Sequence, residues 1–217
     1  RGLGDVYKRQ PSILLDIAER DKISIFGVSA KYISAIEKQG IQPVKTHRLE
    51  HMHTILSTGS PLTHGSFQYI YRCFNPSIQL SSISGGTDIL SAFVAGNPCL
   101  PVYAGEIQCK TLGMDVQIWS DSGESLNEIK GELVCVNSFP SAPIYFWNDP
   151  GDKKYKKAYF EKFTDVWCQG DYGEITSNGG IVIYGRSDAV LNPGGVRIGT
   201  AEIYRQVEKF ETITDSV

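Results

Sequence analysis

The chain has 217 residues, 41% hydrophobic and 11% aromatic, which is enough to bury the core of one large or two small domains. Its formal net charge is −3 and its Lys and Arg residues form no basic stripe, which argues against a nucleic-acid partner, because phosphate binding requires clustered positive charge. No apolar run approaches the roughly 18 residues of a membrane span, and the first residues have no apolar core of a signal peptide.

The chain begins with a segment that carries no structural prediction, and a helix follows it. Residues 1–10 show no helical or strand period, and we treat them as a tail of uncertain origin. From Pro11 the spacing of apolar residues predicts a helix that ends near Asp21 and a strand over 23–28. The predicted inner face of this helix consists of Ile13, Leu14, Ile17 and Ala18. A second helix is predicted over 29–38.

The alternation of predicted helices and strands continues along the chain. Strands are predicted over 53–57 and 78–84, with a helix between them whose inner face carries Phe67, Ile70, Tyr71 and Phe74. Strands alternating with helices through short links indicate right-handed βαβ units and a parallel sheet. Ligands bind beyond the carboxyl ends of such strands. The loop at Gly59-Ser60-Pro61 and the loop over 85–88 are therefore expected to line one cleft.

The second of these loops carries groups suited to a nucleotide. Gly85 and Gly86 would let the chain turn with positive φ and let a ligand approach the main chain. The Thr87 hydroxyl could then bind a phosphate oxygen, and Asp88 could reach a magnesium ion. A plain loop with a helix cap remains the alternative.

The second half of the sequence has the pattern of an antiparallel β region. Strands are predicted over 106–110, 116–120 and 131–136, and a lysine-rich helix over 153–163 with Tyr155, Tyr159 and Phe160 on its buried side. Asn178-Gly179-Gly180 is typical of a hairpin turn, and a last helix is predicted over 201–210. The predicted fold class is therefore α/β, a parallel βαβ sheet followed by a smaller antiparallel region.

Two charged residues flank the predicted hairpin. Asp171 could accept two neighbouring hydroxyl groups, as on a ribose, and Arg186 could donate to the same sugar or to a phosphate. A surface salt bridge between them is the alternative.

Other candidate functional residues have less support. His47 and His51 lack a third metal ligand at a useful spacing, and Ser29, after Gly27-Val28, is interpreted as a helix N-cap rather than a nucleophile. Five scattered cysteines without a Cys-x-x-Cys pair predict free thiols in a reducing compartment, the cytosol. They are Cys73, Cys99, Cys109, Cys135 and Cys168.

Taken together, the motifs resemble those of the adenylate-forming enzymes, the superfamily of acyl-coenzyme A synthetases, luciferases and peptide-synthetase adenylation domains. The matching runs are Gly59-Ser60-Pro61-Leu62, Ser84-Gly85-Gly86-Thr87-Asp88, Gly170-Asp171-Tyr172-Gly173, Gly185-Arg186-Ser187-Asp188 and Gly194-Gly195-Val196-Arg197.

The resemblance implies a role for each run. The first would lie on the adenine side and the second at the phosphates, with Asp88 as the Mg²⁺ ligand where the family usually has a glutamate. Asp171 and Arg186 would hold the ribose, and Arg197 would approach the phosphates. Gly194 and Gly195 would lie near the thiol of coenzyme A, and Asp188 would be a hinge.

A narrower resemblance, to the acetoacetyl-coenzyme A synthetases, covers residues 11–217 and includes the runs at 146–149, 157–160 and 191–193. It implies a ligase with acetoacetate, ATP and coenzyme A as substrates and Mg²⁺ as cofactor. In related acetate-activating synthetases a tryptophan matches Gly85 and closes the acyl pocket, so Gly85 is expected to line a longer pocket here.

The family's phosphate loop and its C-terminal catalytic lysine have no counterpart in this sequence, so we expect a fragment that does not form acyl-adenylates by itself. Residues 11–187 would be the later part of the large AMP-binding domain, and residues 188–217 the hinge and the beginning of the small C-terminal domain. A non-catalytic nucleotide-binding or scaffold module and a synthetase for another short-chain acid remain alternatives. The sequence does not predict the oligomeric state.

Overall fold

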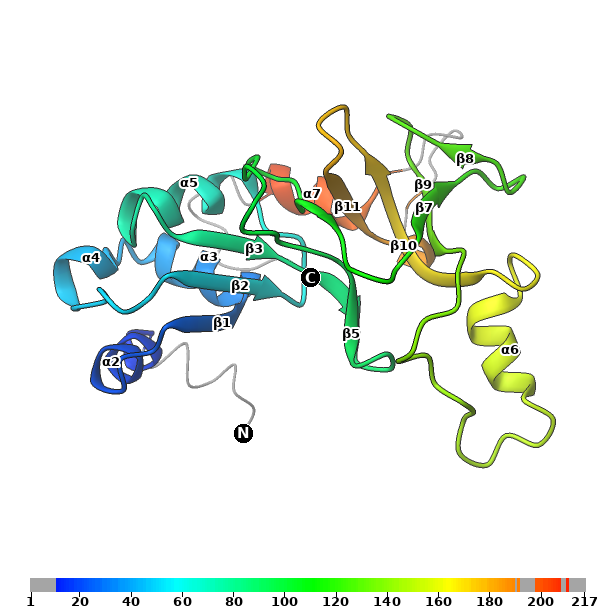
Figure 1. Ribbon diagram of the computed structural model, residues 1–217. Coiled ribbons are helices and arrows are strands. Elements are labelled where there is room, and N and C mark those ends of the chain that lie inside the picture. The colour runs from blue at the N-terminus through cyan, green and yellow to red at the C-terminus, as the bar shows by residue number, and fades with distance from the viewer. Residues whose placement is uncertain (1–10, 190, 192–197, 208–209, 211–217) are drawn as a thin grey trace.

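The computed structural model describes residues 11–189, 191, 198–207 and 210. The first part is a parallel sheet in the order β1-β2-β3, with helices in the connections. Figure 1 shows this sheet and its helices on one side of the molecule. The elements are α2 (Ile13–Arg20), β1 (Ile25–Ser29), α3 (Ala30–Lys38), α4 (Pro43–Thr46), β2 (Thr54–Thr58), α5 (His64–Cys73) and β3 (Gln79–Ser82). The predicted βαβ arrangement is confirmed.

The helix faces follow the predicted spacing with two exceptions, in α2 and α5. In α2 the most deeply buried residues are Leu15 and Ala18, whereas Leu14 and Ile17 are only partly buried, so the predicted inner face was wrong by a fraction of a turn. Leu15 lies in the continuous apolar run Ile13-Leu14-Leu15, and such a run does not show which of its residues face the core. In α5, Tyr69 is buried in place of Tyr71, and its hydroxyl donates to the carbonyl of Ile41 at 2.7 Å.

Two helices of this part begin at hydroxyl N-caps. Ser29 Oγ accepts a hydrogen bond from the Tyr32 amide at 3.1 Å, which confirms the interpretation of Ser29 as a cap. Thr63 Oγ1 accepts from the Ser66 amide at 3.2 Å at the start of α5. Both caps satisfy amides that the first helical turn leaves without a backbone acceptor.

Thr63→Ala is expected to lower the free energy of unfolding by about 1 kcal/mol, because the change removes the cap acceptor and leaves the Ser66 amide without it. Urea denaturation followed by circular dichroism measures this loss. Thr63→Ser keeps the acceptor and should remain within a few tenths of a kcal/mol of the parent protein. Equal losses for both variants would show that the cap contributes nothing.

The second part consists of antiparallel sheets. A five-stranded sheet has the order β11-β10-β9-β7-β8, and a three-stranded sheet has the order β4-β5-β6. The elements are β4 (Ser84–Gly86), β5 (Ser91–Ala95), β6 (Cys109–Lys110), β7 (Val116–Trp119), β8 (Ser125–Leu126), β9 (Gly131–Cys135), α6 (Lys153–Phe160), β10 (Trp167–Ile175), β11 (Ile181–Arg186), η1 (Ser187–Ala189) and α7 (Thr200–Val207). Within the described ranges, antiparallel strands outnumber the three parallel ones, so the prediction of a smaller antiparallel region was wrong in its proportion.

The predicted loop over 85–88 was also wrong in its geometry. The strand predicted over 78–84 is interrupted at Ile83, and Ser84–Gly86 forms its own strand, β4, which pairs antiparallel with β5. The turn follows at Thr87–Leu90, and Gly85 and Gly86 do not have positive φ. Short strands rich in Gly and Ser carry little periodicity, which explains the error.

Each of the two parts is supported by a large hydrophobic cluster. One lies between the parallel sheet and its helices, with Leu15, Ile33, Ile36, Phe67 and Ile70 at its centre. The other lies between α6 and the antiparallel strands and is rich in aromatic rings, among them Phe93, Phe139 and Trp167. In Figure 1 the strand β5 runs between the two parts, α6 lies at the outer end, and α7 packs near β11. No helix in the described ranges is long and apolar enough to cross a membrane.

Candidate functional site

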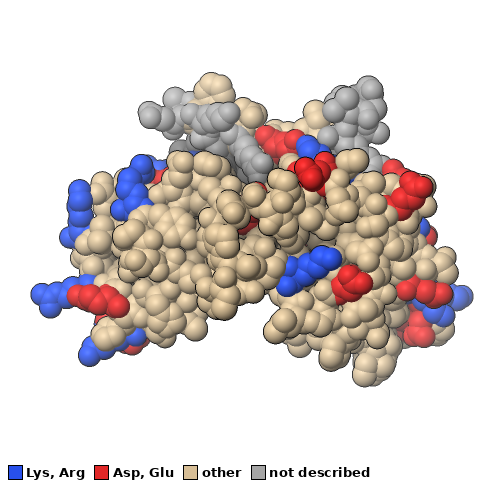
Figure 2. Space-filling view, turned by 45° about the horizontal axis from the view of Figure 1, so that its top comes forward, with Lys and Arg blue, Asp and Glu red and all other residues tan. Residues whose placement is uncertain are grey.

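A cleft of about 730 Å³ lies where the parallel sheet, the β4–β5 hairpin and the β10–β11 hairpin meet. It contains the loop after β2, the strand β4 with Thr87, and the pair Asp171 and Arg186. The lining residues are Thr58, Gly59, Ser60, Pro61, Ser82, Ile83, Ser84, Gly85, Gly86, Thr87, Leu90, Ser91, Ala92, Ile107, Asp171, Ile183, Gly185 and Arg186. The structure thus brings together the two loops that were predicted to share a cleft. On the face shown in Figure 2, positive and negative side chains are interspersed.

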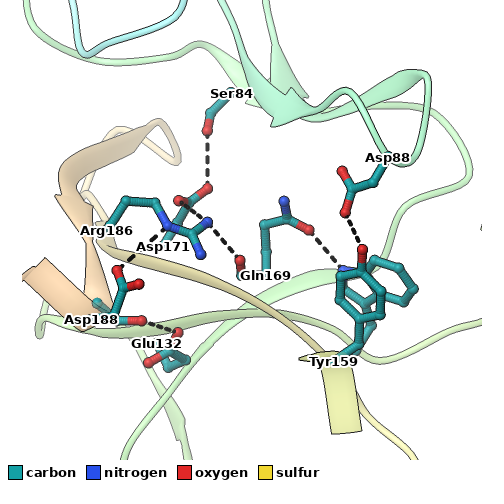
Figure 3. Close-up of polar contacts among 10 residues, drawn as sticks. Ser84, Asp88, Glu132, Tyr159, Gln169, Asp171, Arg186 and Asp188 are labelled. Atoms are coloured by element: carbon teal, nitrogen blue, oxygen red, sulfur yellow. Dashed lines mark hydrogen bonds and ion pairs between the residues drawn. The ribbon is translucent and has the colours of Figure 1, made fainter. Parts of the chain in front are cut away.

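Asp171 and Arg186 lie opposite each other on β10 and β11. Arg186 Nη1 donates to Asp171 Oδ1 at 3.2 Å and to the Gln169 carbonyl at 2.8 Å, and the Ser84 hydroxyl reaches Asp171 Oδ2 at 3.4 Å (Figure 3). Asp171 is 8% exposed, whereas half of the Arg186 side chain is exposed. The pair is therefore an ion pair at the cleft wall, with a buried carboxylate.

The geometry of β10 explains this placement. Its pairing with β9 is interrupted between Cys168 and Tyr172, and Gly170 in the interruption has φ +79°. A Cβ at Gly170 would meet the Arg186 guanidinium, so the glycine leaves the space that Arg186 occupies. Such irregularities redirect side chains at the edges of sheets, and this one leaves Asp171 facing Ser84 on another strand.

Burial raises the pKa of the Asp171 carboxyl above its usual range, while the charge of Arg186 and the Ser84 hydroxyl act in the opposite direction. A carboxyl group with a raised pKa destabilises the folded state when it is ionised, and this cost is felt as the pH rises through that pKa. Ionised Asp171 therefore destabilises the folded protein. A ligand that donates two hydrogen bonds to the carboxylate would offset that free-energy cost.

The turn between β4 and β5 positions Thr87 and Asp88. Ile89 in the turn is 0% exposed and anchors it in the second hydrophobic cluster, so that its polar neighbours face outward. Thr87 lines the cleft. Asp88 is exposed, does not line the cleft, and accepts a hydrogen bond from the Tyr159 hydroxyl at 2.6 Å (Figure 3).

A magnesium ion is compatible with these oxygen donors. No group of three or more His, Cys, Asp or Glu side chains that could hold a metal occurs among the described residues. Magnesium in nucleotide sites commonly takes only one or two carboxylates and completes its coordination with phosphates and water. With Asp88 Oδ2 bound by Tyr159, the oxygen Oδ1 beside Gly86 is the donor suited to such an ion.

Gly85 lines the cleft, but a side chain at this position would point toward strand β5 and not into the cleft. A Cβ at Gly85 would meet the Ser91 carbonyl and Ala92 Cα, which are backbone atoms of β5. The expectation that a larger residue here would simply fill an acyl pocket therefore needs correction, since it would first disturb the β4–β5 pairing.

Gly85→Ala is accordingly expected to destabilise the protein by about 1–3 kcal/mol, because backbone atoms cannot move aside as a flexible side chain can. Urea denaturation of this variant and of Gly27→Ala is the measurement. A Cβ at Gly27 would meet nothing within 4 Å, so this control should be neutral or slightly stabilising. A stable Gly85→Ala variant would refute this close packing.

Some predicted site residues lie elsewhere. Asp188 in η1 is exposed, with its carboxylate 3.7 Å from Arg186 Nε. Gly194, Gly195 and Arg197 fall outside the described residues. His47, discounted as a metal ligand, contacts Asp16 Oδ1 through Nε2 at 3.0 Å.

The sequence did not predict the contacts among Tyr159, Trp167 and Gln169, which do not line the cleft themselves. The indole of Trp167 donates to Gln169 Oε1 at 2.9 Å, and the ring of Tyr159 stacks on Trp167 (Figure 3). The only signal in the sequence was the apolar spacing of Tyr155, Tyr159 and Phe160 on the lysine-rich helix. It indicated a buried face, which the structure confirms most fully for Tyr159, but no polar role for its hydroxyl.

The fold is that of a segment of the adenylate-forming acyl-CoA synthetases. A solved structure of an anthranilate CoA ligase, AuaEII, in complex with anthranoyl-AMP covers 94% of this chain with a TM-score of 0.79, at 17% identity and over 38% of its own length. An acetoacetyl-CoA synthetase from Streptomyces lividans covers 92% of this chain with a TM-score of 0.85, at 41% identity and over 31% of its length. No protein-family model matches the chain.

Similar curated proteins are acetoacetyl-CoA synthetases. Acetoacetyl-coenzyme A synthetase of Rhizobium meliloti is 53% identical over 99% of this chain, and that of Mus musculus is 50% identical over 95%. The chain is thus homologous to the acetoacetyl-CoA synthetases. It spans about a third of their length, 33% and 31% respectively.

Proposed function

We propose that the chain is one segment of an acetoacetate–CoA ligase, and that its cleft holds the ribose and phosphates of ATP and of the acyl-adenylate. The observation that carries the proposal is the convergence of Asp171, Arg186, Thr87 and the Gly59–Pro61 loop on one cleft in a homologue of acetoacetyl-CoA synthetases. We propose residues 11–187 as part of the large domain and 188–217 as the hinge and the start of the small domain.

In this proposal the side chains have complementary tasks. Asp171 accepts hydrogen bonds from the two ribose hydroxyls, and Arg186 holds the Asp171 carboxylate and donates toward the sugar. The Thr87 hydroxyl donates to a phosphate oxygen. Gly59, Ser60 and Pro61 lie on the adenine side. Ser84, Gly85 and Gly86 lie with Thr87 at the phosphates, and Gly85 also borders the acyl group.

The chemical step joins the carboxylate of acetoacetate to the α-phosphate of ATP. The carboxylate oxygen forms a bond to phosphorus, the bond to the bridging oxygen breaks, and pyrophosphate leaves with the electron pair. Asp88 would hold a Mg²⁺ ion, which supplies electrostatic stabilisation of the phosphate charge. Arg197 is proposed to act on the same charge. Coenzyme A then attacks the acyl-adenylate near Gly194 and Gly195, and AMP leaves.

The free thiols support a reducing compartment, and we propose the cytosol. All five cysteines lie among the described residues and are unpaired, three of them buried. Burial raises the pKa of the Cys168 thiol to about 12, so this group is inert at neutral pH.

Exchange of labelled pyrophosphate into ATP by the purified full-length protein tests the proposal. We expect exchange that requires acetoacetate and Mg²⁺, formation of acetoacetyl-CoA and AMP when coenzyme A is added, and a preference of at least about tenfold in kcat/KM for acetoacetate over acetate. The 217-residue chain alone should show no exchange.

Other results would contradict the proposal in different ways. ATP binding without exchange would indicate a nucleotide-binding module that lacks the chemistry. Exchange with another short-chain acid, but not with acetoacetate, would assign a different substrate. Clear turnover by the 217-residue chain would contradict its role as one segment of a larger catalytic unit.

A further inference from the structure

The hydrogen bond between Tyr159 and Asp88 joins two elements that are far apart in the sequence. Tyr159 lies on α6 and Asp88 lies in the β4–β5 turn, 71 residues earlier, and the phenol oxygen is 2.6 Å from Asp88 Oδ2 (Figure 3). This is the short distance of a hydroxyl bound to a carboxylate. An exposed aspartate in a surface turn would otherwise sample several rotamers, so the bond restricts which way the carboxylate faces.

The Tyr159 ring is itself held in place. It stacks on Trp167 with ring centroids 3.7 Å apart and an interplanar angle of 16°, and Phe146 and Tyr155 meet it edge-on. Tyr159 is 9% exposed. The indole of Trp167 is fixed in turn by its hydrogen bond to Gln169. The phenol hydroxyl therefore has a defined position relative to β10.

The other carboxylate oxygen of Asp88 lies against Gly86. A Cβ at Gly86 would overlap Asp88 Oδ1, so the glycine leaves the space that this oxygen occupies. One oxygen of Asp88 is thus bound to Tyr159, and the other is held beside the Gly86 main chain at the edge of the cleft.

We propose that Tyr159 is a positioning residue, which sets the Asp88 carboxylate to receive the divalent cation that accompanies the nucleotide. The inference rests on the proposed role of Asp88 as the Mg²⁺ ligand. Partners that orient a ligating side chain commonly contribute a factor of 10–100 to metal affinity, because they remove the cost of ordering the ligand. Hydrogen bonds also connect Trp167, on which Tyr159 stacks, to Arg186 in the proposed ribose site. Gln169 accepts one from Trp167 through its side chain and one from Arg186 through its main-chain carbonyl.

The test measures metal affinity rather than turnover. Mn²⁺ is titrated into the full-length protein saturated with a non-hydrolysable ATP analogue, and free Mn²⁺ is followed by electron paramagnetic resonance. Tyr159→Phe removes the hydroxyl and keeps the stacked ring, and it is expected to raise the Mn²⁺ dissociation constant by about 10-fold or more. Tyr155→Phe is the matched control, because it makes the same change one turn away without touching Asp88, and it should stay within about twofold.

Asp88→Asn separates the inference from the function on which it rests. If Asp88→Asn weakens Mn²⁺ binding but Tyr159→Phe does not, the positioning role is overturned and the role of Asp88 stands. If Asp88→Asn leaves Mn²⁺ binding unchanged, the proposed metal role of Asp88 fails. Replacement of Tyr159 by 4-aminophenylalanine restores a donor at the same place and should recover the affinity. A failure to recover it, in a protein with unchanged thermal stability, would also overturn the proposal.

Discussion

Asp171→Ala in the full-length protein is expected to weaken ATP binding by on the order of 2–4 kcal/mol, roughly 30- to 1000-fold, because it removes the charged acceptor that we propose for both ribose hydroxyls. Its position supports this expectation: the carboxylate is buried at the cleft wall, with Arg186 on one side and Ser84 on the other. Titration calorimetry with ATP and with 2′,3′-dideoxy-ATP is the measurement. The variant should bind both nucleotides with similar, weak affinity, whereas the parent protein should prefer ATP.

The raised pKa of Asp171 adds a dependence on pH. As the pH falls through that pKa, the carboxyl group gains a proton and loses half of its acceptor capacity, so ATP affinity should fall in the parent protein. Asp171→Asn has no such titration and should give a flat profile of ATP affinity over the same pH range.

If Asp171→Ala left the affinity for ATP unchanged within about twofold, Asp171 would act only as the ion-pair partner of Arg186 and not in nucleotide binding.

Trp167→Ala is expected to have the largest effect on stability, about 3–5 kcal/mol, because it deletes the largest ring of the aromatic cluster. Trp167 is 3% exposed and packs against the rings of Tyr159, Phe93 and Phe139. For a chain of this size the loss corresponds to a decrease of roughly 6–20 °C in Tm. Thermal unfolding followed by far-ultraviolet circular dichroism measures it.

Trp147→Ala is the matched control, because Trp147 is 88% exposed. It should change the free energy of unfolding by no more than about 0.5 kcal/mol. Similar losses for the two variants would mean that the aromatic cluster does not support α6 in the way that the structure indicates.

Much of the parallel half of the fold could be predicted, because α3 and α5 combine a helical spacing of apolar residues with a hydroxyl N-cap, whereas the short helix α4 carries neither signal and was missed. Phe67 and Ile70 recur at a helical interval after Thr63, and Ser29 begins a helix that buries Tyr32, Ile33 and Ile36. The links between these elements are short, which leaves few topologies other than a βαβ arrangement. The boundaries were correct to within a few residues.

The hairpin β4–β5 could not be predicted in the same way. Gly85 and Gly86 have no side chains to alternate, so the sequence suggested a turn where the chain continues as a strand. What decides this conformation is the pairing with Ser91–Ala95, a tertiary contact that a local pattern does not contain.

The candidate site was predictable in its parts but not in its connections. Asp171 and Arg186 stood out because charged residues flank a glycine-rich hairpin, yet the burial of one and not the other depends on the interruption of β10 at Gly170. The bond between Tyr159 and Asp88 spans 71 residues, and no local pattern links an aromatic residue on a lysine-rich helix to a carboxylate in a distant turn.

The central claim is that the cleft holds an acyl-adenylate of acetoacetate, and a crystal structure of the full-length protein with a non-hydrolysable analogue of acetoacetyl-AMP tests it most directly. The account predicts the analogue in the cleft between the Gly59–Pro61 loop and the β10–β11 hairpin. Both ribose hydroxyls should lie about 3 Å from the Asp171 carboxylate, and a phosphate oxygen should lie at the same distance from the Thr87 hydroxyl. An analogue bound elsewhere, or in this cleft with its ribose turned away from Asp171, would contradict the account.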